Sequence, residues 1–495
     1  MTGSRRSPTG RSTTHASVDL DDVQGLLRRA YKDHPESAFV LLRVRDAAAA
    51  RRWLADAPVA SARRAEPLPA RVLQVALTAP GLRALGLPED LLAGFSDEFL
   101  LGLGQDESQA RRLGDIGPNA SAGWLWGCGE RLPHLLLMLY AQPGRLAGWQ
   151  AELADAATGW GTAFDTVTTL GGEALDGREP FGFADGLSQP ELDWARERPP
   201  RDQTRLAYAP LTCLGEFLLG YPNEYGGYTE RPLLDPARDP QGLLPDAEDQ
   251  PGQRDLGRNG SYLVLRQLAQ DVAGFWSCMD RLAGGDAAAR ERLAERLVGR
   301  RRDGTPLVDA DAGDPEGFTF DADTDGLRCP VGAHIRRSNP RNADLPPGDN
   351  TGLSWLLRTL GLDAAARERD RIASTRFHRL LRRGRTYGPA DAPQGLAFVA
   401  LNASLSRQFE FVQGAWIAST QFGGLSGESD PLLGHRLPDA AGRPSDTMTL
   451  PQAGGPGQRL EGLPRFVTVR GGGYFFLPGR RALRYLATVG DGAAP

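Results

Sequence analysis

The spacing of apolar residues in the first half of the chain predicts alternating strands and helices. Runs of consecutive apolar residues favour strands, and apolar residues three or four positions apart favour helices. Strands are expected at residues 38–44, 73–78, 132–141 and 164–172. Helices are expected at 19–33, 46–57, 79–86 and 145–157, and the region 87–131 looks irregular. The main elements follow the order strand, helix, strand, strand, helix, strand, which is the ferredoxin-like plan.

The second half repeats this plan in element order, without any repetition of sequence. Strands are expected at 261–268, 378–388, 395–404 and 465–477, and the second and third of these are expected to be adjacent. Helices are expected at 269–284, 287–300, 406–419 and 481–489. The stretches 222–259 and 303–376 are rich in loop-forming residues, and loops of such length are usually functional or interaction segments.

The element order therefore predicts an α+β fold of two ferredoxin-like domains, of the dimeric α/β barrel kind. Each domain would be an antiparallel sheet with flanking helices. The first domain is expected to span residues 19–230 and the second residues 231–495. Residues 1–18 are expected to form a disordered N-terminal arm.

Composition narrows the class of protein. The 495 residues are 40% hydrophobic and 24% charged, which is ordinary for a globular protein. The net charge of −5 gives no support to a nucleic-acid partner. No apolar run is long enough to span a membrane, and none follows the Arg5–Arg6 pair as a twin-arginine export signal would require. A cytoplasmic location is predicted.

The segment CPVGAHIRRSNPR (329–341) holds the first candidate for chemistry, His334. Small neighbours, Gly332 and Ala333, would let a flat ligand approach the imidazole, which is a common iron ligand. The arginines nearby would suit a ligand that carries carboxylates. A histidine that caps a helix or bridges a loop would explain the same segment, so the segment alone leaves both interpretations open.

Two further segments carry polar candidates. GREPFGFADGLSQP (177–190) places Asp185 between Gly182 and Gly186, where it would act as an acid/base group or simply form an Asp-Gly turn. The glycines would permit close approach of a ligand. RRGRTYG (382–388) begins with Arg382, which would hold an anion in a pocket or belong to a solvated run of arginines.

Taken in order, these three segments resemble the dye-decolorising peroxidases, a family of haem peroxidases. Other stretches are similar to the same family, among them GEFLLGYPNEYG (215–226), LGRNGSYLVLRQL (256–268) and VTVRGGGYFFLP (467–478). The resemblance runs from about residue 19 to the end and is closest to the longer, cytoplasmic members. It implies two ferredoxin-like domains, with one haem b per chain bound against the C-terminal domain.

The resemblance also implies a role for individual residues. His334 matches the proximal ligand of the haem iron, the metal of the site. Asp185 of the GxxDG motif matches the distal aspartate, and Arg382 matches the distal arginine. The remaining matches contact or surround the haem: Arg341 at a propionate with Arg336 as a helper, Gly186 beside the cofactor, and Leu396 and Phe398 as walls of the distal pocket. Glu410 is the candidate carboxylate for the ring N–H of His334.

The function implied is reduction of hydrogen peroxide through an oxyferryl intermediate, followed by oxidation of dyes, phenols or other organic donors. Because the catalytic base would be a carboxylate, the activity is predicted to be highest at acidic pH. Aromatic side chains near the surface would relay electrons from large donors, and the candidates are Trp276, Trp355, Tyr387 and Trp416. The protein would act as a monomer or a homo-oligomer. The alternative is a non-enzymatic haem carrier or sensor on the same fold; motifs of hydrolases and nucleotide-dependent oxidoreductases are absent.

Overall fold

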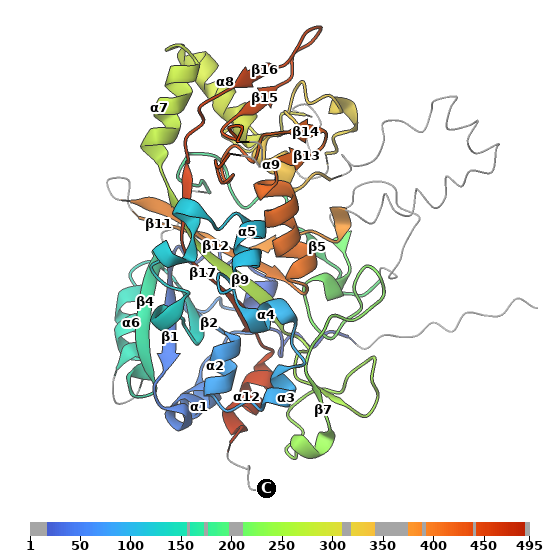
Figure 1. Ribbon diagram of the computed structural model, residues 1–495. Helices are drawn as coiled ribbons and strands as arrows, with labels where there is room; N and C mark the ends of the chain where they lie inside the picture. The colour runs from blue at the N-terminus through green and yellow to red at the C-terminus, as the bar shows by residue number, and fades with distance from the viewer. Residues whose placement is uncertain are drawn as a thin grey trace, which may run out of the picture.

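A nine-stranded antiparallel sheet organises the part of the chain that the computed structural model describes: residues 17–155, 159–172, 177–197, 211–308, 318–341, 375–388, 393–438 and 442–490 (Figure 1). The strand order is β10-β12-β9-β17-β2-β3-β1-β4, and β11 also pairs with β12. The predicted α+β class is confirmed, and the sheet with its flanking helices is consistent with two ferredoxin-like domains. The expected arm at residues 1–18 falls almost wholly outside the described residues.

The first half supplies four neighbouring strands and the helices that cover them. Their bounds confirm the predicted elements: β1 (Glu36–Val44), α1 (Ala47–Asp56), β2 (Arg71–Leu77), α2 (Ala79–Ala84), β3 (Leu135–Ala141), α6 (Leu146–Ala154) and β4 (Phe164–Gly172). The strands β1, β2 and β3 are recognisable in the sequence because both of their faces are covered, whereas β4 is largely exposed. In β1, Val40 and Leu42 pack in one apolar cluster, whereas Phe39 and Leu41 pack in a second cluster on the opposite face.

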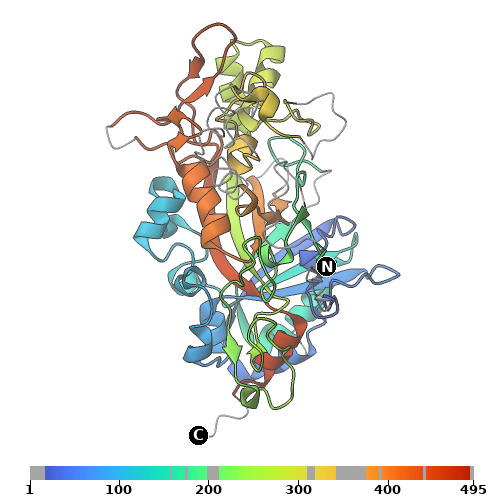
Figure 2. The same ribbon diagram turned by 90° about the vertical axis from the view of Figure 1, so that its right-hand side faces the viewer.

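The second half supplies the other strands and again follows the prediction. Its elements are β9 (Ser261–Gln270), α7 (Val272–Leu282), α8 (Ala287–Val298), α9 (His334–Ser338), β10 (Leu381–Arg382), β11 (Arg385–Tyr387), β12 (Gln394–Asn402), β17 (Val467–Leu477) and α12 (Arg480–Thr488). Figure 2 shows α7 and α8 in yellow-green at one end of the elongated molecule and α12 in red near the other. The strand predicted at 378–388 is thus two short strands, both paired with β12.

Short strands pair outside the main sheet: β5 (Glu191–Leu192) with β6 (Leu211–Thr212), β7 (Leu233–Leu234) with β8 (Arg254–Asp255), β13 (Gln421–Phe422) with β14 (Leu425–Ser426), and β15 (Met448–Leu450) with β16 (Gln458–Leu460). The helix predicted at 406–419 is present as two π-helical segments, Ser406–Glu410 and Val412–Ala418. The pair β7–β8 lies in the connector between the halves, where we propose the domain boundary at residues 230 and 231.

The two halves meet at β17. Phe476 of β17 pairs with Leu77 of β2, which makes the sheet continuous. Further along β17, residues 125–127 of the first half lie against it, and Trp126 forms a bridge to Gly471. A Cβ atom on Gly471 would lie 2.5 Å from Nε1 of Trp126, so only glycine permits this approach. The glycine run in VTVRGGGYFFLP thus allows a segment of the first half to pack directly on the last strand.

Two predictions for the first half are wrong. The segment 19–33 contains only a short 3₁₀ turn, Gly25–Leu27, because distant groups bind its backbone and side chains: the Leu26 N–H donates to Gln74 Oε1, and Gln24 donates to the carbonyl of Val75. The region 87–131 is not irregular throughout. It holds three short helices: α3 (Glu89–Leu92), α4 (Asp97–Leu101) and α5 (Glu107–Leu113).

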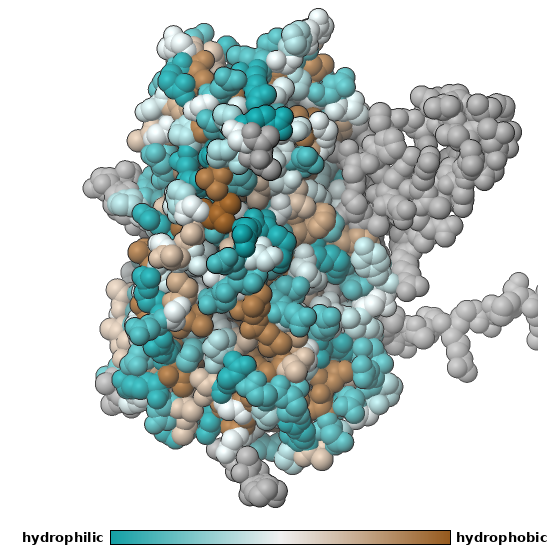
Figure 3. Space-filling view, viewed as in Figure 1, coloured by the Kyte–Doolittle hydropathy of each residue, from teal (hydrophilic) through white to brown (hydrophobic). Residues whose placement is uncertain are grey.

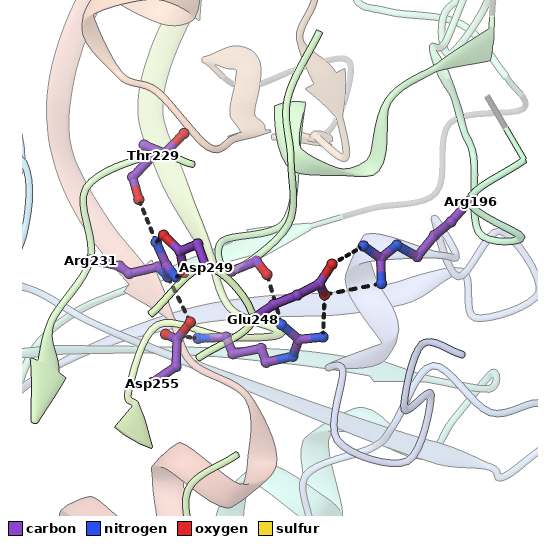
Figure 4. Close-up of polar contacts among 8 residues, drawn as sticks. Arg196, Thr229, Arg231, Glu248, Asp249 and Asp255 are labelled. Atoms are coloured by element: carbon purple, nitrogen blue, oxygen red, sulfur yellow. Dashed lines mark hydrogen bonds and ion pairs between the residues drawn. The ribbon is translucent and has the colours of Figure 1, made fainter. Parts of the chain in front are cut away.

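A partly buried ionic network lies in the connector between the halves (Figure 4). The carboxylate of Glu248 accepts hydrogen bonds from Arg196 and, at 3.0 Å, from Arg258, and both guanidinium groups lie against the ring of Tyr221. Next to it, Arg231 pairs with Asp249 and Asp255. Burial raises the pKa of Glu248, but the hydrogen bonds and charges of the two arginines outweigh it and lower the pKa to about 2.

We expect Glu248→Gln to destabilise the protein at neutral pH. Because the folded-state pKa lies below the usual value of 4.5, the stabilisation is complete above about pH 4.5 and is lost as the pH falls towards 2. Because Glu248 is only partly buried and solvent screens its charge, the contribution should be on the order of 1 kcal/mol. Urea unfolding at pH 7 and pH 3 measures the loss of stability in the variant. The control is Glu89→Gln, since Glu89 forms an exposed pair with Arg83. An unchanged unfolding midpoint of the Glu248 variant at pH 7 would contradict this role.

The described surface is mixed in character. On the face shown in Figure 3, hydrophobic residues occur in small groups among hydrophilic ones. The large hydrophobic side chains most exposed among the described residues are Leu125, Tyr225 and Leu101. Within those residues, no helix has the length and apolar character needed to cross a membrane.

Candidate active site

The three segments singled out in the sequence converge on one cavity of about 280 Å³. His334, Asp185 and Arg382 all contribute to its wall. Along the chain, Asp185 precedes His334 by 149 residues and Arg382 by 197 residues. Most of the wall is apolar. The apolar lining includes Phe181, Phe183, Leu268, Val298, Ile335, Leu380, Leu396, Phe398, Phe409, Val412, Ile417, Leu432, Leu433 and Val467.

His334 begins α9, directly after the N-cap residue Ala333. Its Nδ1 lies 2.9 Å from Oδ2 of the buried Asp430, whose other oxygen accepts the N–H groups of Leu432 and Leu433. Burial lowers the pKa of His334, but the charge and hydrogen bond of Asp430 outweigh it, so the pKa is raised. The bond to Asp430 places the ring proton on Nδ1 and leaves Nε2 as the nitrogen able to bind a ligand.

The expectation that Glu410 binds the His334 ring is wrong, because Asp430 occupies that position. Glu410 instead accepts hydrogen bonds from Gln109 at 2.8 Å and from the Tyr474 hydroxyl at 2.9 Å. It therefore joins α5 to β17 rather than supporting His334.

The loop 177–190 carries Asp185 to the same cavity wall. Gly182 and Gly186 flank it with φ angles of 97° and 77°, which favour glycine. The backbone N–H of Asp185 donates to Gly177, and the side chain accepts from the N–H of Gly186. Asp185 itself is exposed, with its side chain on the cavity. Gly186 shapes this turn but is not one of the lining residues.

Arg382 lies on β10, and the Asp185 loop holds it at two points. Its Nη2 donates to the carbonyl of Leu187 at 2.6 Å, and its backbone N–H donates to Oε1 of Gln189 at 2.9 Å. On β12, Leu396 and Phe398 face the same cavity, and the alternate residue between them, Ala397, is buried on the other face of the sheet. Asp185 and Arg382 therefore line the same cavity as these two apolar side chains.

The arginines of the segment 329–341 have different positions. Arg341 is buried at the cavity wall, with its guanidinium carbon 3.8 Å from the centroid of the Phe318 ring. Arg336 does not line the cavity, because its guanidinium group donates to the carbonyls of Asp323 and Cys329. The expected contact of Arg336 with a ligand in the cavity is therefore not supported.

Comparisons with known proteins agree on one family. No protein-family model matches the chain. A multifunctional dye peroxidase of Amycolatopsis sp. (strain ATCC 39116 / 75iv2) is 32% identical over 336 residues, which cover 63% of this chain but only 61% of that protein. A dye-decolorizing peroxidase of Mycetinis scorodonius is 26% identical over 97% of this chain and 89% of its own. The curated relatives and the solved structures are all dye-decolorising peroxidases, which agrees with the family that the sequence resembles.

Solved structures support the fold of this chain. A DyP-type peroxidase from Auricularia auricula-judae superposes with a TM-score of 0.71 at 23% identity, over 96% of this chain and 100% of that one. A dye-decolorizing peroxidase variant in complex with cyanide superposes with a TM-score of 0.70 at 22% identity. The family consists of haem-dependent oxidoreductases that act on hydrogen peroxide.

Several residues of the cavity wall were not predicted from the sequence. They are Glu179, Ser188, Arg300, His378 and Arg379 on the cavity and Asp430 behind His334. Of the aromatic candidates for electron transfer, Trp416 lines the cavity and Trp355 lies outside the described residues. His378 stacks on Phe411 with 3.7 Å between ring centroids. Of the missed residues on the wall, Glu179 and Ser188 lie inside the segment 177–190, so the motif around Asp185 was the signal that could have found them.

We expect Asp430→Asn to weaken the binding of the iron-containing cofactor by about 10–100-fold, the usual effect of losing a carboxylate partner of a ligating histidine. Glu410→Gln is the matched control, because it removes a buried carboxylate that does not contact His334. Titration of the cofactor-free protein with haem, followed by absorption, measures the affinity. Equal affinities for the two variants would contradict the assignment of Asp430.

Proposed function

We propose that the protein is a haem peroxidase that reduces hydrogen peroxide and oxidises dyes, phenols or other organic donors. The observation that carries the proposal is the meeting of His334, Asp185 and Arg382 on one apolar-walled cavity. The relatives are named as peroxidases of dyes, which supports the same reaction and substrate class.

The residues present fit haem b, the cofactor that the family implies. The imidazole of His334 donates from Nδ1 to Asp430, which increases the basicity of Nε2 towards iron. The apolar lining suits a flat macrocycle, and the buried guanidinium group of Arg341 at the wall suits its carboxylates. When bound, haem supplies an iron that takes up peroxide and exchanges single electrons with donors.

The other residues act on protons and charge. Asp185, with its carboxylate on the cavity, takes a proton from one peroxide oxygen and delivers it to the other, so that water leaves. Arg382 stabilises the negative charge that develops on the departing oxygen, and the bonds to Leu187 and Gln189 hold it in place beforehand. Leu396 and Phe398 exclude bulk water, which strengthens both interactions.

An absorption titration tests the proposal. The cofactor-free protein is titrated with haem, and one equivalent of hydrogen peroxide is then added. Binding, followed by a spectral change that reverses when a dye or phenol is added, would support a peroxidase. Binding without such a change would favour a haem carrier or sensor. No binding would contradict the assignment of His334 and the function together.

A further inference from the structure

The three residues after Asp185–Gly186 make contact with arginines from three later parts of the chain. Two of them, Leu187 and Gln189, bind Arg382 through its guanidinium group and its backbone. The position of Arg382 therefore depends directly on the conformation of Leu187–Gln189.

The middle residue, Ser188, binds a different pair of arginines. Its Oγ accepts hydrogen bonds from Arg300 at 2.7 Å and from Arg341 at 2.9 Å. Ser188 has a φ of 53°, a left-handed conformation that is rare for serine. Such a conformation persists when the surrounding contacts determine it. Here the contacts on both sides of Ser188 supply that constraint.

Arg300 and Arg341 form a positively charged part of the cavity wall. Both are buried, with exposed fractions of 6% and 2%, and both lie against the Phe318 ring, at 5.3 and 3.8 Å from its centroid. Two guanidinium groups at one hydroxyl and one ring are suited to a ligand with carboxylates, because each presents a fork of donors.

We propose that Ser188 is a positioning residue that couples this arginine pair to Asp185 and Arg382. The inference rests on the proposed function, since the carboxylates would be those of haem. Carboxylates bound by Arg300 and Arg341 fix the two donors on the Ser188 hydroxyl. Because Ser188 lies between Leu187 and Gln189, this fixes the two acceptors of Arg382 as well. Cofactor binding at one part of the wall thereby organises the peroxide-binding part.

Cyanide affinity of the ferric protein tests this coupling, because a bound anion near Arg382 reports on its placement. Wild type, Ser188→Ala and Ser188→Gly are each reconstituted with haem and with haem dimethyl ester, which lacks the free carboxylates. We expect wild type to bind cyanide at least about fivefold more weakly with the ester, a typical lower value for coupled sites. In both variants the cyanide affinity should be the same with haem and with the ester, within about twofold, since the Ser188 hydroxyl that links the arginine pair to Arg382 is absent.

The variants separate the hydroxyl from the backbone. Ser188→Gly relieves the left-handed conformation and Ser188→Ala does not, so equal behaviour of the two assigns the coupling to the hydroxyl. Ser338→Ala is the matched control, because Ser338 lines the cavity but donates to the carbonyl of Ile335, and it should retain the wild-type difference.

Two results would overturn the inference: a wild type indifferent to esterification, or Ser188 variants that keep the wild-type difference. Either leaves the peroxidase proposal standing if haem-loaded wild type still reacts with peroxide. Failure of wild type to bind haem would overturn both.

Discussion

Replacing Asp185 by Asn or Arg382 by Leu is expected to slow the reaction with peroxide by about 10²–10⁴-fold while haem stays bound. Asn cannot accept and return the proton that moves between the peroxide oxygens. Leu cannot stabilise the charge on the departing oxygen. His334 is held by its hydrogen bond to Asp430, and Arg382 is held by those to Leu187 and Gln189, so iron ligation should persist. Stopped-flow absorption of the haem-loaded variants at increasing peroxide measures the rate constant.

Glu191→Gln is the control for the first of these variants. Glu191 is an exposed carboxylate at the start of β5, six residues after Asp185, and it is absent from the cavity wall. Its replacement should leave the rate constant unchanged. Wild-type rates in both Asp185→Asn and Arg382→Leu would contradict the assignment of the acid/base pair and favour the carrier function.

The second large effect is expected for His334→Ala. Loss of a partner behind a ligating histidine costs about 10–100-fold in affinity, so loss of the ligand itself should weaken haem binding by at least about 100-fold. The cavity left by the imidazole is beside Asp430, which remains able to bind a ring N–H. Added imidazole should therefore restore much of the haem affinity and the ferric spectrum.

His435→Ala is the matched histidine variant, since the His435 ring accepts from the N–H of Leu437 and does not line the cavity. It should bind haem like wild type. If His334→Ala retained full affinity and an unchanged ferric spectrum, with no response to imidazole, another residue would have to be the iron ligand.

The sheet was predictable because its strands are continuous apolar runs covered on both faces, as in β1 and β3. The segment 19–33 was not, because its apolar spacing fits a helix equally well. Its conformation is decided by the Gln74 side chain, 48 residues from Leu26, and by the backbone carbonyl of Val75, 51 residues from Gln24. The local spacing of apolar residues carries no information about such hydrogen bonds.

The same limit applies to the cavity. His334, Asp185 and Arg382 stand in recognisable motifs, and the structure brings them to one wall. Asp430 reaches His334 across 96 residues, and Arg300 reaches Ser188 across 112. Glu410 was the carboxylate expected at the His334 ring, but Asp430, in the segment after β14, is the one that binds it. Pairing of this kind is a property of the folded chain.

The continuous sheet has a consequence for any attempt to divide the protein. Strand β2 of the first half pairs with β17 of the second half, at Leu77 and Phe476, so each half covers an edge strand of the other. Residues 125–127 of the first half cover more of β17. A fragment that began at residue 231 would expose unpaired backbone along β17, and such edges recruit other chains. The C-terminal half is therefore unsuited to use as a minimal haem-binding module. A circular permutant that keeps both halves would be the sounder starting point for engineering.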